Sequence, residues 1–169
     1  MKSNGTPAAE SRARRFEESA QASREAIRIF PDYAGSVIWY DMIGPVPYEE
    51  THLSTDLIAD MEEWEANYYR SVSDHYSFKS KRAEREHITR GLEVARALSE
   101  EIGDVLPVEA DEIGGGKTRF LTPGFGTNPE ARASFAAMLA EAEAEDARVA
   151  AKLRSGARFD YRPLSYPRN

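Results

Sequence analysis

The stretch from Val37 to Val72 reads VIWYDMIGPVPYEETHLSTDLIADMEEWEANYYRSV, and the rest of the chain is organised around it. It begins as a β-branched and aromatic strand, crosses a segment stiffened by two prolines and ends in a strongly amphipathic helix. Ser54 or Thr55 can cap the first turn of this helix. Its apolar side chains recur at helical spacing, which predicts one buried stripe. The stripe consists of Leu57, Ile58, Met61, Trp64, Tyr68 and Val72.

The opposite side of this predicted helix is acidic. Its polar side chains follow one another at steps of four, three and four residues, so they share a solvent-facing stripe. Asp56 also stands in the first turn, where the helix dipole favours a negative charge. We predict that this stripe binds a partner, together with an aromatic side chain at its edge. The predicted partner-binding residues are Asp56, Asp60, Glu63, Asn67 and Tyr69.

Length and composition indicate one globular domain with its own core. The chain has 169 residues, of which 41% are hydrophobic and 10% aromatic. It has no cysteine, which excludes disulfides, thiolate metal sites and a cysteine nucleophile. No apolar run has the length of a membrane span, and the polar N-terminus lacks the apolar core of a signal peptide. We therefore expect a cytoplasmic protein without a membrane partner.

The charges are distributed unevenly along the chain. The formal net charge is −7, but residues 29–151 carry −13, whereas residues 1–28 carry +2 and residues 152–169 carry +4. An acidic body repels nucleic acid and attracts cationic surfaces. The alternative is that the acidic helices only keep a small protein in solution. The charge pattern thus favours a cationic protein partner over nucleic acid.

The order of the predicted elements indicates an α+β fold. We expect an antiparallel sheet of two hairpins packed with three main helices in a single domain. The first hairpin is predicted over 26–30 and 37–40, with Gly44-Pro45-Val46-Pro47 ending its second strand, and the second hairpin over 105–112 and 118–122. Two further helices are predicted over 82–102 and 128–154, the first ending at Gly103 and the second beginning at Asn128 and Pro129.

The two ends of the chain are predicted to differ from the domain between them. In residues 1–24 nearly all apolar side chains are alanines and Phe16 is the one large hydrophobe, so we expect a marginal helix or a flexible segment. Residues 25–156 form the predicted α+β domain. Residues 157–169 carry aromatics, prolines and arginines, which predicts an extended C-terminal tail.

Two motifs resemble ligand sites but lack parts that those sites need. The run from Gly114 to Thr118 ends like a phosphate-binding loop, yet Asp111 stands where that loop has a glycine, and the following residues predict a strand instead of a helix. Glu84 and His87 have the spacing of a di-metal carboxylate site, but such a site needs a second pair and two further glutamates. We interpret the glycines as a hairpin turn and the Glu84–His87 pair as a solvated helix face, and we predict no metal and no cofactor.

One group of residues favours catalysis. Asp41, Glu49, Glu50 and His52 surround the proline-rich crossing, where a strand end, a loop and a helix start can bring two carboxylates and an imidazole together. Such a group suits a metal-assisted hydrolase. The same residue types are ordinary in an exposed loop, and no nucleophile or oxyanion feature accompanies them. An enzyme is therefore the alternative, and we lean towards a protein without catalysis.

The segment from Trp39 to Gly103 resembles a group of small bacterial α+β proteins. The resemblance rests on the strand with its aromatics, on HLSTDL at 52–57, on Glu63-Trp64-Glu65, on Gly91-Leu92 and on ALSEEIG at 97–103. Some members of this group are immunity-type proteins that bind secreted toxins. The resemblance implies an immunity or antitoxin-like inhibitor and brings no catalytic residues. The resulting expectation is a non-catalytic protein that binds a macromolecular partner through its acidic face, with the oligomeric state left open.

Overall fold

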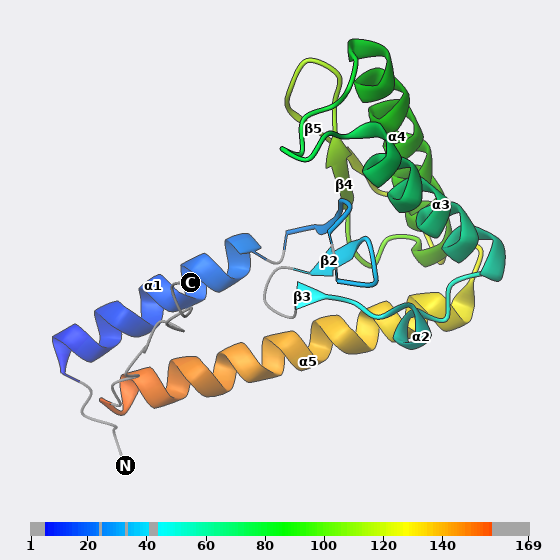
Figure 1. The fold of residues 1–169 in the computed structure, drawn as a ribbon. Coiled ribbons are helices and arrows are strands. Elements are labelled where there is room, and N and C mark those ends of the chain that lie inside the picture. The colour runs from blue at the N-terminus through cyan, green and yellow to red at the C-terminus, as the bar shows by residue number, and fades with distance from the viewer. Residues whose placement is uncertain (1–5, 24, 33, 41–43, 157–169) are drawn as a thin grey trace.

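In the computed structural model, the described part of the chain comprises residues 6–23, 25–32, 34–40 and 44–156. These residues form an α+β fold with a five-stranded sheet and four helices of seven or more residues (Figure 1). The helices are α1 (Pro7–Ser23), the short α2 (Tyr48–Thr51), α3 (Thr55–Ser71), α4 (Lys81–Ile102) and α5 (Pro129–Arg154). The strands are β1 (Ile27–Ile29), β2 (Ile38–Tyr40), β3 (Gly44–Pro45), β4 (Val108–Asp111) and β5 (Lys117–Phe120).

The sheet confirms both predicted hairpins and joins them in a way that the sequence pattern did not indicate. Its strand order is β3-β2-β1-β4-β5, with antiparallel pairs β1–β2 and β4–β5. The two hairpins meet at β1 and β4, which run parallel, with Ile27 opposite Val108. A parallel pair needs a long crossover connection, and α3 and α4 lie in that connection. The sheet is therefore mixed and not wholly antiparallel.

The proline-rich crossing adds a short edge strand instead of only ending the first hairpin. Gly44 and Pro45 form β3, which pairs antiparallel with β2 at Tyr40 and Trp39. The amide of Val46 continues this contact by donating to the carbonyl of Ile38 at 2.8 Å. Proline is tolerated here because β3 lies at the edge of the sheet, where a strand can lack a donor on one side.

The core lies between the sheet, the helices α3 and α4 and the first half of α5. Helix α4 contacts α3, α5, β4 and β5, so it is the element around which the core packs. The indole of Trp64 lies over Gly91, where an added methyl group would come within 2.7 Å of the ring. Glycine at this position thus permits the close helix approach that the sequence suggested. The largest fully buried side chains are Ile27, Ile38, Met61, Leu98 and Ile102.

The molecule has two limbs that meet at the strands β1 to β3 (Figure 1). One limb contains α3, α4 and the β4–β5 hairpin. In the other, α1 packs along α5, with buried Ala9, Ala13 and Ala20 on α1 and an ion pair between Glu17 and Arg154. Helix α1 is thus a fourth main helix, and α5 provides the surface that a segment poor in large hydrophobes needs. The predicted division of the chain at residues 24 and 156 stays a prediction.

The ends of the helices follow the predicted local signals. The Ser54 side chain accepts a hydrogen bond from the amide of Leu57 at 3.3 Å, and Asn128 accepts one from the amide of Ala131 at 3.1 Å. Gly103 follows α4 with a φ of 69° and ends that helix.

Candidate functional site

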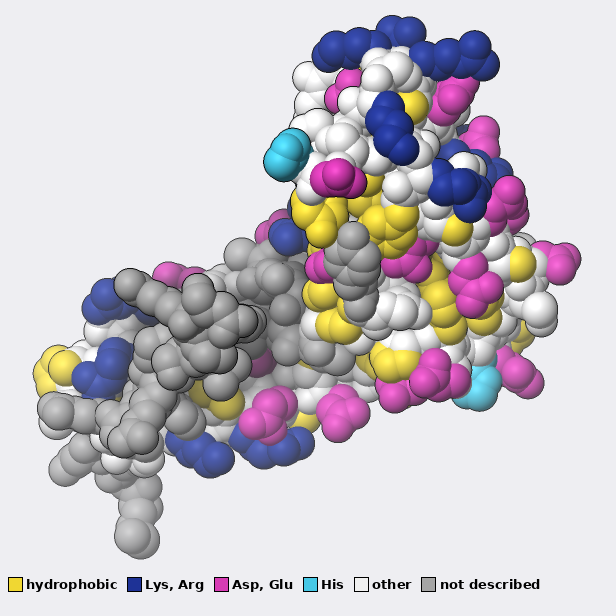
Figure 2. Space-filling view, in the orientation of Figure 1, with side chains coloured by type: hydrophobic (Ala, Val, Ile, Leu, Met, Phe, Trp, Pro, Cys, Tyr) yellow, Lys and Arg dark blue, Asp and Glu magenta, His cyan; other side chains and the backbone are white. Residues whose placement is uncertain are grey.

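The predicted acidic stripe lies on the side of α3 that faces away from the core. We call Asp56, Asp60, Glu63 and Asn67 the outer face of α3. Asp56, Glu63 and Asn67 are exposed, whereas Leu57, Met61 and Trp64 on the opposite side are buried. In the space-filling view, acidic side chains lie among basic ones on the side of the molecule that carries α3 (Figure 2). The helical spacing therefore positions these side chains as expected.

One acidic side chain on the outer face of α3 forms an ion pair with a neighbouring helix. Arg90 of α4 lies 2.8 Å from the carboxylate of Asp60 and also pairs with Glu93 at 2.9 Å. Asp60 is therefore paired with a cation from a neighbouring helix, which the spacing of residues along α3 could not show. Within the described residues, Asp56 and Glu63 form no ion pair. The negative charge available to a partner is thus concentrated on these two residues.

Tyr69 contributes less surface than its place at the edge of the stripe suggested. Its side chain is half-buried and packs edge-on against Tyr68, with ring centroids 5.2 Å apart. The pKa of the Glu65 carboxyl on the same helix is raised, mainly by burial. Tyr69 therefore lies at the boundary between the outer face of α3 and the buried side of this helix.

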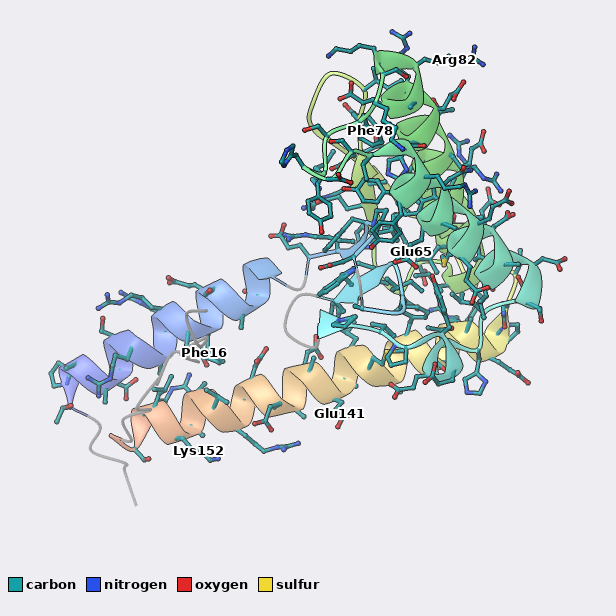
Figure 3. The ribbon with its side chains drawn as sticks, in the orientation of Figure 1. Phe16, Glu65, Phe78, Arg82, Glu141 and Lys152 are labelled. Carbon is teal, nitrogen blue, oxygen red and sulfur yellow. The ribbon has the colours of Figure 1, made fainter. Side chains whose placement is uncertain are left out.

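A second feature, which the sequence did not predict as a site, is a cleft between the start of α4 and the β4–β5 hairpin. We call it the aromatic cleft; its volume is about 870 Å³. Figure 3 shows Phe78 beside α4 in this part of the molecule. The apolar part of its lining consists of Phe30, Pro31, Tyr68, Phe78, His87 and Ile88.

His87 is the centre of the ring contacts at this cleft. Its imidazole stacks on the indole of Trp64 at 4.8 Å and lies 5.1 Å from the ring of Tyr68 and 5.4 Å from that of Phe78. The indole N–H of Trp64 donates to the carbonyl of His87 at 2.9 Å. Burial lowers the pKa of His87 to about 4, and the carboxylate of Asp111 offsets this effect in part. His87 is therefore neutral at pH 7.

The interpretation of Glu84 and His87 as a solvated helix face is wrong for His87. Glu84 pairs with Lys81 at 3.7 Å, whereas His87 is half-buried among rings. The contacts come from Trp64 and Tyr68 on α3 and from Phe78 in the loop before α4, so local sequence could not show them. The one hint in the sequence was that Trp64 and Tyr68 lie four residues apart, so both rings point to the same side of α3.

The residues of the catalytic alternative do not form a common site in the described part of the chain. Asp41 lies outside the described residues. Glu49 and Glu50 are exposed on α2, and His52 is exposed just after it with a φ of 53°. Glu50 lines a shallow groove against α5 of about 340 Å³, which His52 does not reach. Among the described residues, no three His, Cys, Asp or Glu side chains are grouped so that they could hold a metal ion.

The glycine run forms the turn of the second hairpin. Gly114, Gly115 and Gly116 all have a positive φ, which glycine adopts without strain. Strand β5 follows directly, and the ammonium of Lys117 lies 2.8 Å from the carboxylate of Asp111. The loop therefore lacks the helix that supports phosphates in a nucleotide site.

A comparison with protein families identifies one that matches this chain. The model of the family described as Serratia CdiI immunity protein-like matches residues 25–110, just over half of the 169 residues. This match contains the whole segment on which the resemblance was based, and it runs from just before β1 into β4. No curated protein and no solved structure matches the chain. In the described residues, no helix is long and apolar enough to span a membrane. The chain therefore belongs to the Serratia CdiI immunity protein-like family.

Proposed function

We propose that this protein is an immunity protein that binds a toxin and inhibits it without catalysis, and that the outer face of α3 is where the toxin docks. The family match carries the first part of this proposal, because an immunity protein acts by binding a toxin. The cytoplasm remains the expected location. The toxin is expected to present a cationic surface, since the middle of the chain has a net charge of −13.

Two carboxylates on the outer face of α3 remain free for a partner, and α3, unlike α5, lies within the residues that the family model matches. Asp56 and Glu63 are exposed and, in the described part of the chain, not paired with a cation. Asp60 lies between them and shares Arg90 with Glu93. Exposed charges of this kind accelerate the encounter with a cationic partner more than they stabilise the final complex.

The proposal is tested by association kinetics with the toxin domain at two ionic strengths. The variant Asp56→Asn, Asp60→Asn, Glu63→Gln removes three charges, and we expect association to slow roughly tenfold at low salt, with a weaker salt dependence, because exposed charges are screened within about 10 Å at 0.1 M salt. Folding stability should hardly change, because exposed ion pairs contribute little to it.

Helix α5 offers a matched control. Glu141, Glu143 and Glu145 are exposed, and of these Glu145 pairs with Arg148 at 2.6 Å, much as Asp60 pairs with Arg90. Replacing all three with Gln makes the same change in net charge on another helix and should leave the association rate within about twofold. Equal slowing by both variants would show that net charge, and not the outer face of α3, steers the toxin.

A further inference from the structure

The aromatic cleft combines rings with carboxylates that come from different elements. Tyr68 comes from α3, Phe78 from the loop before α4, and Asp111 and Glu112 from the β4–β5 hairpin. Large apolar side chains are exposed on two of the segments that line it: Tyr76 at 59% in the loop before α4 and Ile113 at 55% in the turn of the β4–β5 hairpin. Aromatic surface surrounded by charged side chains is typical of the energetic centre of a protein interface.

The charges that line the aromatic cleft leave one negative charge uncompensated. Lys81 pairs with Glu84 at 3.7 Å, and Lys117 pairs with Asp111 at 2.8 Å. The carboxylate of Glu112 accepts a hydrogen bond from the hydroxyl of Thr118 and, within the described residues, pairs with no cation. The three carboxylates and two ammonium groups of the lining therefore sum to one negative charge.

This arrangement suits a cation better than an anion. An anion would have to compete with the carboxylates that already pair with the two lysines, whereas a cation can pair with Glu112 and leave both existing ion pairs intact. A guanidinium group also stacks on aromatic rings while it pairs with a carboxylate, which a compact ammonium group does less well. The chain itself uses such contacts: the guanidinium of Arg96 lies 5.2 Å from the ring centre of Phe120, and that of Arg132 lies 4.9 Å from the ring centre of Phe125.

We propose that the aromatic cleft receives an arginine side chain of the toxin, which packs against the rings of Tyr68 and Phe78 and pairs with Glu112. The identity of the partner rests on the proposed function, but the chemistry of the cleft does not. In this arrangement the outer face of α3 governs the association rate of the toxin, and the aromatic cleft governs its dissociation rate.

The cleft is tested first without the toxin, by NMR titration with three small probes. These are the N-acetyl, N-methylamide derivatives of arginine, lysine and citrulline; citrulline has the shape of arginine without its charge. We expect saturable shifts at Tyr68, Phe78 and Glu112 with the arginine probe, roughly threefold weaker binding of the lysine probe and no saturation with the citrulline probe.

Glu112→Gln is the decisive variant, because the amide oxygen of glutamine can still accept the hydrogen bond from Thr118. We expect it to weaken binding of the arginine probe roughly threefold or more, whereas Glu143→Gln, an exposed change on α5, should leave it unchanged. Equal shifts with citrulline, an unchanged affinity in Glu112→Gln, or saturable binding of inorganic phosphate at the same signals would each overturn the proposal.

The complex with the toxin separates this inference from the proposed function. Glu112→Gln should raise the dissociation rate roughly threefold or more with little effect on association, because contacts buried in an interface act mainly on dissociation. The three-residue variant of α3 should do the opposite. If the toxin binds but Glu112→Gln leaves dissociation unchanged, the cleft proposal fails and the immunity function stands. If the protein binds the arginine probe saturably but does not bind the toxin, the cleft binds arginine as inferred and the proposed immunity function fails.

Discussion

The two limbs of this protein each contain a pair of packed helices, and the two pairs are held together by different means. In the α3–α4 pair, the indole of Trp64 lies on Gly91 and donates a hydrogen bond to the backbone of α4. In the α1–α5 pair, the buried contacts are mostly alanines such as Ala13 and Ala150, supplemented by an ion pair. A large ring in a glycine notch buries much apolar area at one point, whereas an alanine face buries little at each residue.

The difference between the pairs coincides with the extent of the family match. Residues 25–110 include α3, α4 and most of the sheet but neither α1 nor α5. Both surfaces that we propose for the toxin are built mainly from the matched part. We therefore expect the α3–α4 pair to govern folding stability and binding, and the contact between α1 and α5 to tolerate change.

The largest expected effect is that of Trp64→Ala. Trp64 is 4% exposed, so its truncation leaves a cavity over Gly91 and should lower the free energy of unfolding by about 3–5 kcal/mol. Phe16→Ala is the matched change in the α1–α5 pair, and it should cost only about 1–2 kcal/mol because Phe16 is half-buried. Denaturant unfolding measures both values. A loss below about 1 kcal/mol for Trp64→Ala would show that this ring is not a core residue.

A smaller loss of folding stability is expected when the pH is lowered from 7 towards 4. The unfolded chain protonates His87 near its ordinary pKa of 6.5, whereas the folded state resists protonation down to about 4. The contribution of neutral His87 is therefore fully present above pH 6.5 and is lost as the pH falls towards 4. The pKa shift sets an upper limit of about 3 kcal/mol on this contribution to the free energy of unfolding. The actual loss should be smaller, because solvent screens the partly exposed ring.

This pH effect is specific to the α3–α4 pair, because α1 and α5 contain no histidine. The measurement is the free energy of unfolding of the natural chain and of His87→Phe between pH 7 and pH 4. Phenylalanine keeps a ring beside Trp64 but does not titrate, so the variant should lose less stability over this range. Parallel curves for the two proteins would refute the assignment to His87.

The smallest effect is expected from the ion pair of the α1–α5 pair. Glu17 and Arg154 are about 40% exposed, so Glu17→Gln should cost between about 0.2 and 1 kcal/mol. The loss should also shrink in high salt, because exposed pairs are screened. Thermal unfolding at low and high salt provides the measurement. A loss above about 2 kcal/mol would mean that this one contact, and not the alanine face, holds the two helices together.

Much of the candidate surface could be predicted from helical spacing. Asp56 and Glu63 share the outer face of α3 because a helix repeats every 3.6 residues, which needs no tertiary information. The partner of Asp60 could not be predicted, because Arg90 reaches it from α4, thirty residues further along the chain. The burial of His87 was missed for the same reason, since its neighbours come from α3 and from the loop before α4.

The sequence by itself determined the features whose interactions span only a few residues. Ser54 and Asn128 cap their helices, Gly103 ends α4 and the glycine run turns the second hairpin, all through contacts within about one helical turn. The family resemblance was likewise visible in the sequence and is confirmed by the match to residues 25–110.

The tertiary structure alone decided how these elements meet. The parallel pairing of β1 with β4 joins residues about eighty positions apart, and hydrophobic patterns do not encode which strands become neighbours. Helix α1 packs because α5 lies beside it, although its own alanines predicted only a marginal helix. The aromatic cleft likewise exists only where α3, α4 and the β4–β5 hairpin come together. Long-range packing fixes such features, so no single stretch of sequence could reveal them.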